Sequence, residues 1–310
     1  MNRLSRPLRP LFRPLFGALL TLALLAGCTT TPPAPPVAPE PPPKVRVGLA
    51  LGGGAAKGFA HIGVIKMLEA NGIKIDTVAG TSAGSVVGGL YASGLDAFAL
   101  QEKAFGLDEA AIRDVSLLNG GIVKGQKLQD FVNQLVGNRP IDKFAKPFGA
   151  VATELDTGKR TVFVRGNAGQ AIRASSSIPG VFEPALIAGK RYVDGGVVSP
   201  VPVDAARELG ADIVIAVDIS TKAGNKAPSG LIGTVNQAVV IMGQKLGEQE
   251  LTRADVVIRP KVGKIGPTDF DQKNQAILEG EKAALAAIPQ IKQKIAEKQQ
   301  ALIAARMAKR

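Results

Sequence analysis

Short apolar segments alternate with helical patterns along most of the chain. Runs of β-branched and other apolar residues predict strands, and apolar residues at three- and four-residue spacing predict helices. The predicted strands are residues 45–51, 76–79, 148–154, 161–164, 213–217 and 256–259, and the predicted helices are residues 58–70, 83–92, 95–105, 127–136, 202–209 and 231–251. Continuous apolar strands between helices are typical of a buried sheet covered on both faces. The pattern therefore predicts one α/β domain over residues 44–288, a three-layer α/β/α sandwich with a mostly parallel central sheet.

The first 28 residues have a different composition, typical of a targeting segment. Residues 1–27 hold four Arg and no acidic residue, and an apolar stretch of signal-peptide length covers residues 15–26. The sequence LAGC at residues 25–28 resembles the bacterial lipoprotein box, which implies that residues 1–27 are a lipoprotein signal peptide and that Cys28 carries acyl chains. Thr29 follows in place of Asp, and by the same resemblance this favours the outer membrane of a Gram-negative bacterium. An ordinary signal peptide with an incidental Cys is the alternative.

Two further segments flank the predicted domain. Residues 29–43 contain eight Pro, which exclude helix and sheet and favour extended polyproline II, so we expect residues 28–43 to be a spacer. After Pro289, apolar residues recur at helical spacing among Lys residues, which predicts a basic amphipathic C-terminal helix over residues 289–310. This helix either packs on the domain or contacts anionic lipid, and the sequence leaves both alternatives open.

Composition excludes several classes of function. The formal charge is +12, but residues 1–27 contribute four of these charges and residues 281–310 contribute five, which leaves +3 elsewhere. Without a basic stripe, without Trp and with only two Tyr, the chain lacks the usual means of binding nucleic acid. A single Cys excludes a disulfide framework and a Cys-based zinc site. We expect neither a metal nor an organic cofactor.

A nucleophile motif stands between a predicted strand and a predicted helix. Gly80-Thr81-Ser82-Ala83-Gly84 fits the G-x-S-x-G pattern, in which the Ser occupies a strained turn. The two Gly remove side chains that would clash as the chain reverses. The helix that follows brings its free N–H groups and the positive end of its dipole to the Ser hydroxyl. Ser82 is therefore the candidate nucleophile, with an ordinary structural turn as the alternative.

A glycine-rich loop stands between the first strand and the first helix. Gly52-Gly53-Gly54-Ala55-Ala56-Lys57-Gly58 exposes backbone N–H groups and lets an oxygen approach closely, which suits an oxyanion hole. A similar spacing of Gly describes a dinucleotide phosphate loop, which requires an acidic residue at the end of the second strand. Here Asp76 stands at the start of that strand, and the nucleophile motif stands at its end. The pair of loops favours acyl transfer over nucleotide binding.

The chain has a single His, so a catalytic base must be either this residue or a carboxylate. His61 lies inside the helix that leaves the glycine-rich loop, where a packed or capping role is favoured over catalysis. Asp194, followed by Gly195 and Gly196 at the end of a short apolar strand, is the best carboxylate candidate, although Asp-Gly is also an ordinary turn. Burial would raise its pKa above the reference value of about 3.9 and suit the carboxylate to accept a proton from Ser82.

The three motifs, in this order, resemble the bacterial branch of the patatin-like phospholipase family. The ASSSIP segment at residues 174–179 adds to the resemblance, which covers about residues 46–220. It implies a dyad of Ser82 as nucleophile and Asp194 as base, without His. The resemblance assigns to the oxyanion hole the N–H groups of Gly53, Gly54 and Ala55, with Lys57 as the basic residue of the loop. The remaining motif residues are Gly80, Gly84, Gly195 and Gly196. Ala55 stands where many members have a further Gly.

The expected function is hydrolysis of a lipid ester through an acyl-enzyme, with the membrane anchor keeping the domain near its substrate. A non-catalytic envelope scaffold and nucleotide binding at the glycine-rich loop are the alternatives. Among the weaker clusters, Asp269 and Asp271 favour capping over a cation site, and residues 175–177 favour a loop that lines the site. Asp218, at the end of a strand, is either structural or part of the ligand crevice.

Overall fold

A mixed sheet of eight strands forms the centre of the computed structural model, which describes residues 42–106, 114–116, 122–223 and 230–308. Five strands pair in parallel: β1 (Val47–Leu51), β2 (Thr77–Thr81), β5 (Phe148–Glu154), β9 (Ile213–Val217) and β10 (Val256–Ile258). Three are antiparallel: β6 (Arg160–Phe163), β7 (Ala185–Ile187) and β8 (Lys190–Asp194). The order is β10-β9-β1-β2-β5-β8-β7, with β6 also paired to β5. The mostly parallel sheet is confirmed.

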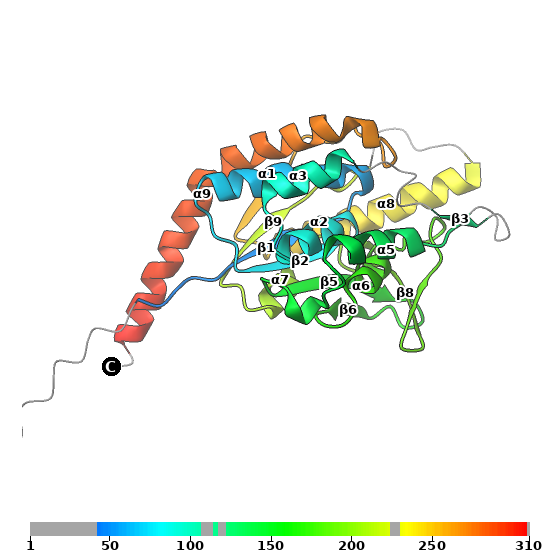
Figure 1. Ribbon diagram of the computed structural model, residues 1–310. Coiled ribbons are helices and arrows are strands. Elements are labelled where there is room, and N and C mark those ends of the chain that lie inside the picture. The colour runs from blue at the N-terminus through cyan, green and yellow to red at the C-terminus, as the bar shows by residue number, and fades with distance from the viewer. Residues whose placement is uncertain (1–41, 107–113, 117–121, 224–229, 309–310) are drawn as a thin grey trace, which may run out of the picture. The chain divides into compact units, whose positions relative to one another are not determined.

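Helices cover both faces of this sheet, which confirms the three-layer sandwich (Figure 1). The helices of the described residues are α1 (Phe59–Ala70), α2 (Ala83–Ala92), α3 (Ala97–Phe105), α5 (Gln126–Leu135), α6 (Ala168–Ser175), α7 (Val203–Glu208), α8 (Gly230–Leu251) and α9 (Lys273–Met307). A short 3-10 turn (Ala55–Gly58) leads into α1, and two small strands, β3 (Val115–Ser116) and β4 (Ile122–Val123), pair with each other. Helices α1, α2, α3, α5, α6 and α9 share the largest hydrophobic core, α7 and the end of α8 share a second, and a third, small cluster lies around Tyr192.

The alternation of side chains along the strands explains the two larger cores. Leu49 and Leu51 of β1 lie in the core of α1, α2 and α9, whereas Ala50 lies in the core of α7. The second core is built largely from Ala and Val, so α7 approaches the sheet closely. Gly48 is part of this approach, because a Cβ there would lie 2.5 Å from the Cβ of Ala211.

The C-terminal helix differs from the prediction. The sequence predicts a separate helix over residues 289–310, but α9 begins at Lys273 and Pro289 lies inside it. Pro removes one backbone hydrogen bond and bends a helix rather than always ending it, and Figure 1 shows α9 changing direction along its length. Ile291 is fully buried and Ile295 packs against the core, so this part of α9 packs on the domain.

The topology brings the candidate motifs to one edge of the sheet. β1 and β2 are adjacent and parallel, so the glycine-rich loop after Leu51 and the turn at Ser82 leave the same edge. β8 runs antiparallel to β5, and Asp194 pairs there with Ala152, the residue after the partner of Thr81. The strand register therefore brings Asp194 to the level of Ser82.

The predicted signal peptide, Cys28 and most of the predicted spacer lie outside the described residues. Within the described ranges, no helix combines the length and the hydropathy needed to cross a membrane. The described helix α6 and the strands β3, β4 and β7 are absent from the sequence prediction.

Candidate active site

Ser82 occupies a strained turn between β2 and α2. Its backbone has φ 54° and ψ −125°, a region that residues other than Gly rarely adopt. The turn is tight, since a Cβ at Gly80 would lie 2.3 Å from the carbonyl oxygen of Gly84, and one at Gly84 would lie 2.1 Å from that of Leu51. The Gly of the motif are therefore required by close packing, and they hold Ser82 at the start of α2.

The backbone of Ser82 is held by Ser175, which the sequence indicated only as part of a loop near the site. The Ser82 N–H donates to Ser175 Oγ at 3.0 Å, and Ser175 Oγ donates to the carbonyl oxygen of Val151 at 2.5 Å. Ser175 is fully buried at the end of α6. The only sequence signal was the run of three Ser, which indicated a loop near the site. Ser175 instead supports the backbone of Ser82.

Asp194 is buried and held firmly by its backbone. Its N–H donates to the carbonyl oxygen of Ser177 at 2.8 Å, and its carbonyl oxygen accepts from Thr153 Oγ1 at 2.9 Å. The N–H of Gly196 donates to Asp194 Oδ1 at 2.7 Å, whereas Oδ2 is buried and has no hydrogen-bond partner among the described residues. Burial raises the pKa of the Asp194 carboxyl to about 6, against the opposing influence of the Ser82 hydroxyl and the Gly196 N–H. The carboxylate is therefore ionised at neutral pH and is a stronger base than an exposed Asp.

The glycine-rich loop offers fewer oxyanion donors than the resemblance implies. The N–H of Gly53 donates to the carbonyl oxygen of Pro200 at 3.0 Å and is therefore occupied. The N–H groups of Gly54 and Ala55 have no hydrogen-bond partner within the described part of the chain. Ala55 has φ 51° and lines the same cavity as Ser82. In this conformation the N–H group of Gly53 is occupied, which leaves those of Gly54 and Ala55 as the available donors.

Lys57 is directed away from the cavity at Ser82. Its side chain is buried, its Nζ donates to Thr221 Oγ1 at 2.7 Å, and it does not line the cavity that contains Ser82. Burial lowers the pKa of Lys57, with partial compensation by the charge of Asp218. Asp218 in turn accepts hydrogen bonds from Ser220 and Lys222, which identifies it as a paired structural carboxylate. The two residues brace the end of β9 against the loop.

His61 is a packed residue, in agreement with the interpretation of the sequence. It is fully buried, and its Nε2 lies 2.8 Å from the carbonyl oxygen of Gly52, to which it must donate. Burial lowers the pKa of His61 to about 4, so the ring is neutral at neutral pH. His61 positions the start of the glycine-rich loop and does not line the cavity at Ser82.

An acidic residue of α8 supports the site from the opposite core. Ser199 Oγ donates to Glu250 Oε1 at 2.5 Å, and the N–H of Val201 donates to Glu250 Oε2 at 2.8 Å. The carbonyl oxygen of Ser199 accepts from Thr81 Oγ1 at 2.8 Å. Burial raises the pKa of Glu250 to about 7. Glu250 thus fixes the segment that occupies the N–H of Gly53, and no local sequence pattern indicates this role.

Ser82 opens onto an apolar cavity of about 360 Å³. The lining residues are Ala55, Ala56, Gly58, Phe59, Ser82, Ala83, Val86, Val87, Leu128, Phe131, Ser176, Ile178, Val181, Phe182, Pro267, Thr268 and Phe270. No charged side chain is among them, and the buried hydroxyl of Ser176 has no partner among the described residues. A cavity with these walls fits an aliphatic chain better than a polar ligand.

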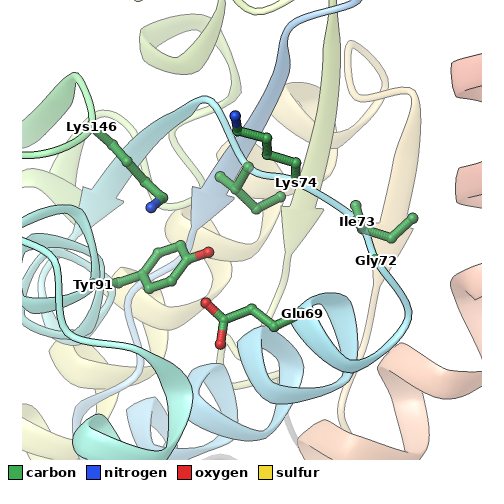
Figure 2. Close-up of a pocket in the computed structure, with 7 residues that line it drawn as sticks. Glu69, Gly72, Ile73, Lys74, Tyr91 and Lys146 are labelled. Atoms are coloured by element: carbon green, nitrogen blue, oxygen red, sulfur yellow. The ribbon is translucent and has the colours of Figure 1, made fainter.

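A second, more polar pocket lies at the opposite edge of the sheet (Figure 2). Its walls include Lys74, which precedes β2, and Lys146, which precedes β5, so it lies at the amino ends of these strands. Figure 2 shows the Tyr91 hydroxyl directed towards Glu69, and Lys146 Nζ lies 4.8 Å from the centre of the Tyr91 ring. Burial and Glu69 raise the pKa of Tyr91, so its phenol stays neutral. This pocket is remote from Ser82 and contains no activated nucleophile.

The weak cation-site alternative at Asp269 is not supported. Asp269 Oδ2 accepts hydrogen bonds from the N–H of Gly266 and from Gln272 Nε2, which is a capping arrangement. Within the residues that the structure describes, no group of three or more His, Cys, Asp or Glu is arranged to hold a metal ion.

Known proteins share parts of this sequence. The family profile described as patatin-like phospholipase matches residues 49–207, about half of the chain. An uncharacterised NTE family protein of Mycobacterium tuberculosis is 43% identical over 178 residues, which are 56% of this chain and 49% of that protein. A lysophospholipase of Pyricularia oryzae is 29% identical over 278 residues, which are 79% of this chain and 18% of that protein. The chain thus spans about half the length of the first of these relatives and less of the second.

One solved structure shares the fold. The crystal structure of VipD from Legionella pneumophila superposes with a TM-score of 0.50 at 15% sequence identity, over 79% of this chain and 66% of that chain. At this level of identity the similarity concerns the fold alone, and it agrees with the mixed sheet and its two helical layers.

Proposed function

Because the chain belongs to the patatin-like phospholipase family, we propose that it is a serine acyl hydrolase that cleaves carboxylic esters of lipids. The observation that carries the proposal is the position of Ser82. It stands in a strained turn on the wall of an apolar cavity, next to a buried carboxylate whose pKa burial raises to about 6. The cavity suits the acyl chain of a lipid, and the lysophospholipase relative is named for such a substrate.

The proposed reaction uses the Ser82–Asp194 dyad. Ser82 Oγ attacks the ester carbonyl carbon while its proton passes to Asp194 Oδ2, the oxygen without a partner. The negative charge that develops on the carbonyl oxygen is stabilised by the N–H groups of Gly54 and Ala55 and by the N-terminus of α2. The tetrahedral intermediate expels the alcohol, which takes the proton from Asp194. Water, deprotonated by Asp194, then attacks the acyl-enzyme, and Ser82 recovers its proton as the fatty acid leaves.

Nucleotide binding at the glycine-rich loop fits the geometry less well. A phosphate loop needs several free N–H groups, but those of Gly52, Gly53 and Ala56 donate to backbone carbonyls of the protein itself. Asp76, the acid at the start of the second strand, is paired with Lys44 at the far edge of the sheet. These contacts favour the hydrolase. Labelling of Ser82 distinguishes the hydrolase from the non-catalytic scaffold.

The direct test is labelling of the purified protein with a fluorophosphonate probe. We expect wild type to be labelled and to hydrolyse a soluble p-nitrophenyl ester, Ser82→Ala to do neither, and Asp194→Asn to lose at least about a thousandfold in turnover. His61→Gln should keep at least a tenth of the activity, because its ring contacts the loop and not the substrate. A folded wild type that is neither labelled nor active would favour the scaffold.

We also propose that the chain is held at the cell envelope by acylation of Cys28, in the outer membrane of a Gram-negative bacterium. The proposal rests on the lipoprotein box at residues 25–28 and on the Pro-rich residues 29–43 that follow it. An anchored hydrolase would meet lipid substrates at high local concentration.

A further inference from the structure

Helix α8 carries an apolar face that no described part of the protein covers. Leu231, Val235, Val239 and Met242 are 80%, 56%, 54% and 57% exposed. Their spacing of four, four and three residues brings them to one side of the helix. Residues 230–244 contain no charged residue at all. A solvent-facing side of a helix is ordinarily polar, so this face indicates a contact with another apolar surface.

The length of α8 carries this face beyond the edge of the sheet at which Ser82 lies. The 22 residues of α8 span about 33 Å, whereas the five residues of the adjacent β9 span about 17 Å. The C-terminal end is fixed in the protein by Glu250. The N-terminal half must therefore extend beyond the edge of the sheet at which β9 ends, which is the edge of Ser82. Figure 1 shows α8, in yellow, projecting on this side.

Exposed basic residues lie at the same edge. Lys222 follows β9, and Arg259 follows β10; both lie within ion-pair distance of the single carboxylate of Asp218. Lys261 and Lys264 are exposed and make no ion pair among the described residues. They belong to the segment that continues into Pro267 and Phe270, two residues of the cavity wall. Net positive charge thus lies at the edge of the sheet from which the N-terminal half of α8 projects.

We propose that the apolar face of α8 docks on an anionic lipid surface and aligns the cavity at Ser82 with it. Apolar side chains would enter the acyl region while the Lys residues contact the headgroups. A second copy of the chain is a poorer occupant, because a two-fold contact through α8 would bring two like-charged rims together. The inference rests on the proposed function, since it explains how a lipid ester reaches the cavity.

The test compares two double variants with the same charge change and the same spacing. V235E/M242E alters the apolar face of α8, and L278E/L285E alters two exposed Leu of α9 that lie among charged residues. All proteins are the full chain carrying Cys28→Ser, which removes acylation as a source of membrane binding. The probe is a vesicle of phosphatidylcholine with one third phosphatidylglycerol, and binding is measured by flotation.

We expect V235E/M242E to bind the vesicles at least about tenfold more weakly and to hydrolyse a vesicle-borne ester correspondingly more slowly. Its hydrolysis of a soluble p-nitrophenyl ester should stay within about twofold of wild type, and L278E/L285E should match wild type in all three assays. If circular dichroism shows V235E/M242E to be unfolded, V235Q/M242Q replaces it.

Equal vesicle binding by the two double variants would overturn the proposal. It would also be overturned if wild type sediments as a dimer that V235E/M242E dissociates, because the occupant would then be a second copy. If wild type hydrolyses neither the soluble nor the vesicle-borne ester, the proposed function is refuted instead. The flotation result would still show whether the apolar face of α8 docks on lipid.

Discussion

Two residues of the site hold backbone conformations that their side chains disfavour. Ser82 has φ 54° and Ala55 has φ 51°, in the region that favours Gly. Close packing imposes the first, because Gly80 and Gly84 leave no room for another path. Ala55 lies where a free N–H can face the cavity of Ser82. Both strained residues line the same cavity.

The raised pKa of Asp194 predicts the pH dependence of the reaction. The carboxyl must be ionised to accept a proton, and its pKa is about 6. We therefore expect kcat/KM for a soluble ester to fall about tenfold for each pH unit below 6 and to level off above about pH 7. The measurement is a pH profile between 4.5 and 8.

The matching control is His61→Gln, which should show the same inflection, because His61 has a pKa of about 4 and stays neutral over most of this range. An activity that remains constant down to pH 4.5 would exclude a base with the pKa assigned to Asp194.

At the scale of elements, α1 and α9 cross at a contact that only Gly permits. A Cβ at Gly280 would lie 2.0 Å from the carbonyl oxygen of Ala60, and one at Gly63 would lie 2.0 Å from that of Ile277. The salt bridge of Lys66 with Glu281 lies at the same crossing. α1 leaves the glycine-rich loop, so this contact also sets the position of the loop.

We expect Gly280→Ala to lower the free energy of unfolding by about 1–3 kcal/mol, since the clash with backbone outweighs the gain of about 1 kcal/mol in helix propensity. Gly243→Ala on α8 is the matched substitution, because a Cβ there meets nothing within 4 Å, and it should be neutral or stabilising. Urea unfolding of the two variants measures the difference. Equal effects would show that α9 can shift at no cost.

At the scale of the whole molecule, the family domain matches residues 49–207 and the described fold extends well beyond it through α8 and α9. Helix α8 supports the site through Glu250, and the segment that precedes α9 contributes Phe270 to the cavity wall. The proposed anchor at Cys28 and the apolar face of α8 are separate means of contact with lipid.

The proposed anchoring predicts that a palmitate analogue fed to an expressing Gram-negative cell labels the wild-type chain and not Cys28→Ser. Wild type should also remain in the membrane fraction after a high-salt wash, whereas Cys28→Ser should be released, since one peripheral helix binds reversibly. Ser82→Ala serves as the control and should be labelled like wild type. A labelled Cys28→Ser chain would place the acyl group elsewhere.

Much of the fold follows from local pattern. Apolar runs and helical spacing were sufficient for the five parallel strands, for most helices and for the α/β/α layers, because burial on both faces leaves a clear trace in the sequence. The turn at Ser82 could also be predicted from the sequence, because the two Gly that its close packing requires, Gly80 and Gly84, lie only four residues apart. Asp194 was located by its motif, and its burial confirms the expected environment.

The roles that sequence reasoning missed depend on partners far away in the chain. The N–H of Gly53 is occupied by Pro200, and Ser175 supports Ser82 across 93 residues. Helix α9 continues through Pro289, where Ile288 and Ile291 are buried in the core. A hydrogen bond made by a single N–H or hydroxyl group leaves no periodic pattern in the sequence. Which carbonyl oxygen accepts that bond depends on how distant segments pack. The chain thus specifies its layers and the turn at Ser82 locally, whereas the donors around that turn are selected by three-dimensional contacts that no short segment contains.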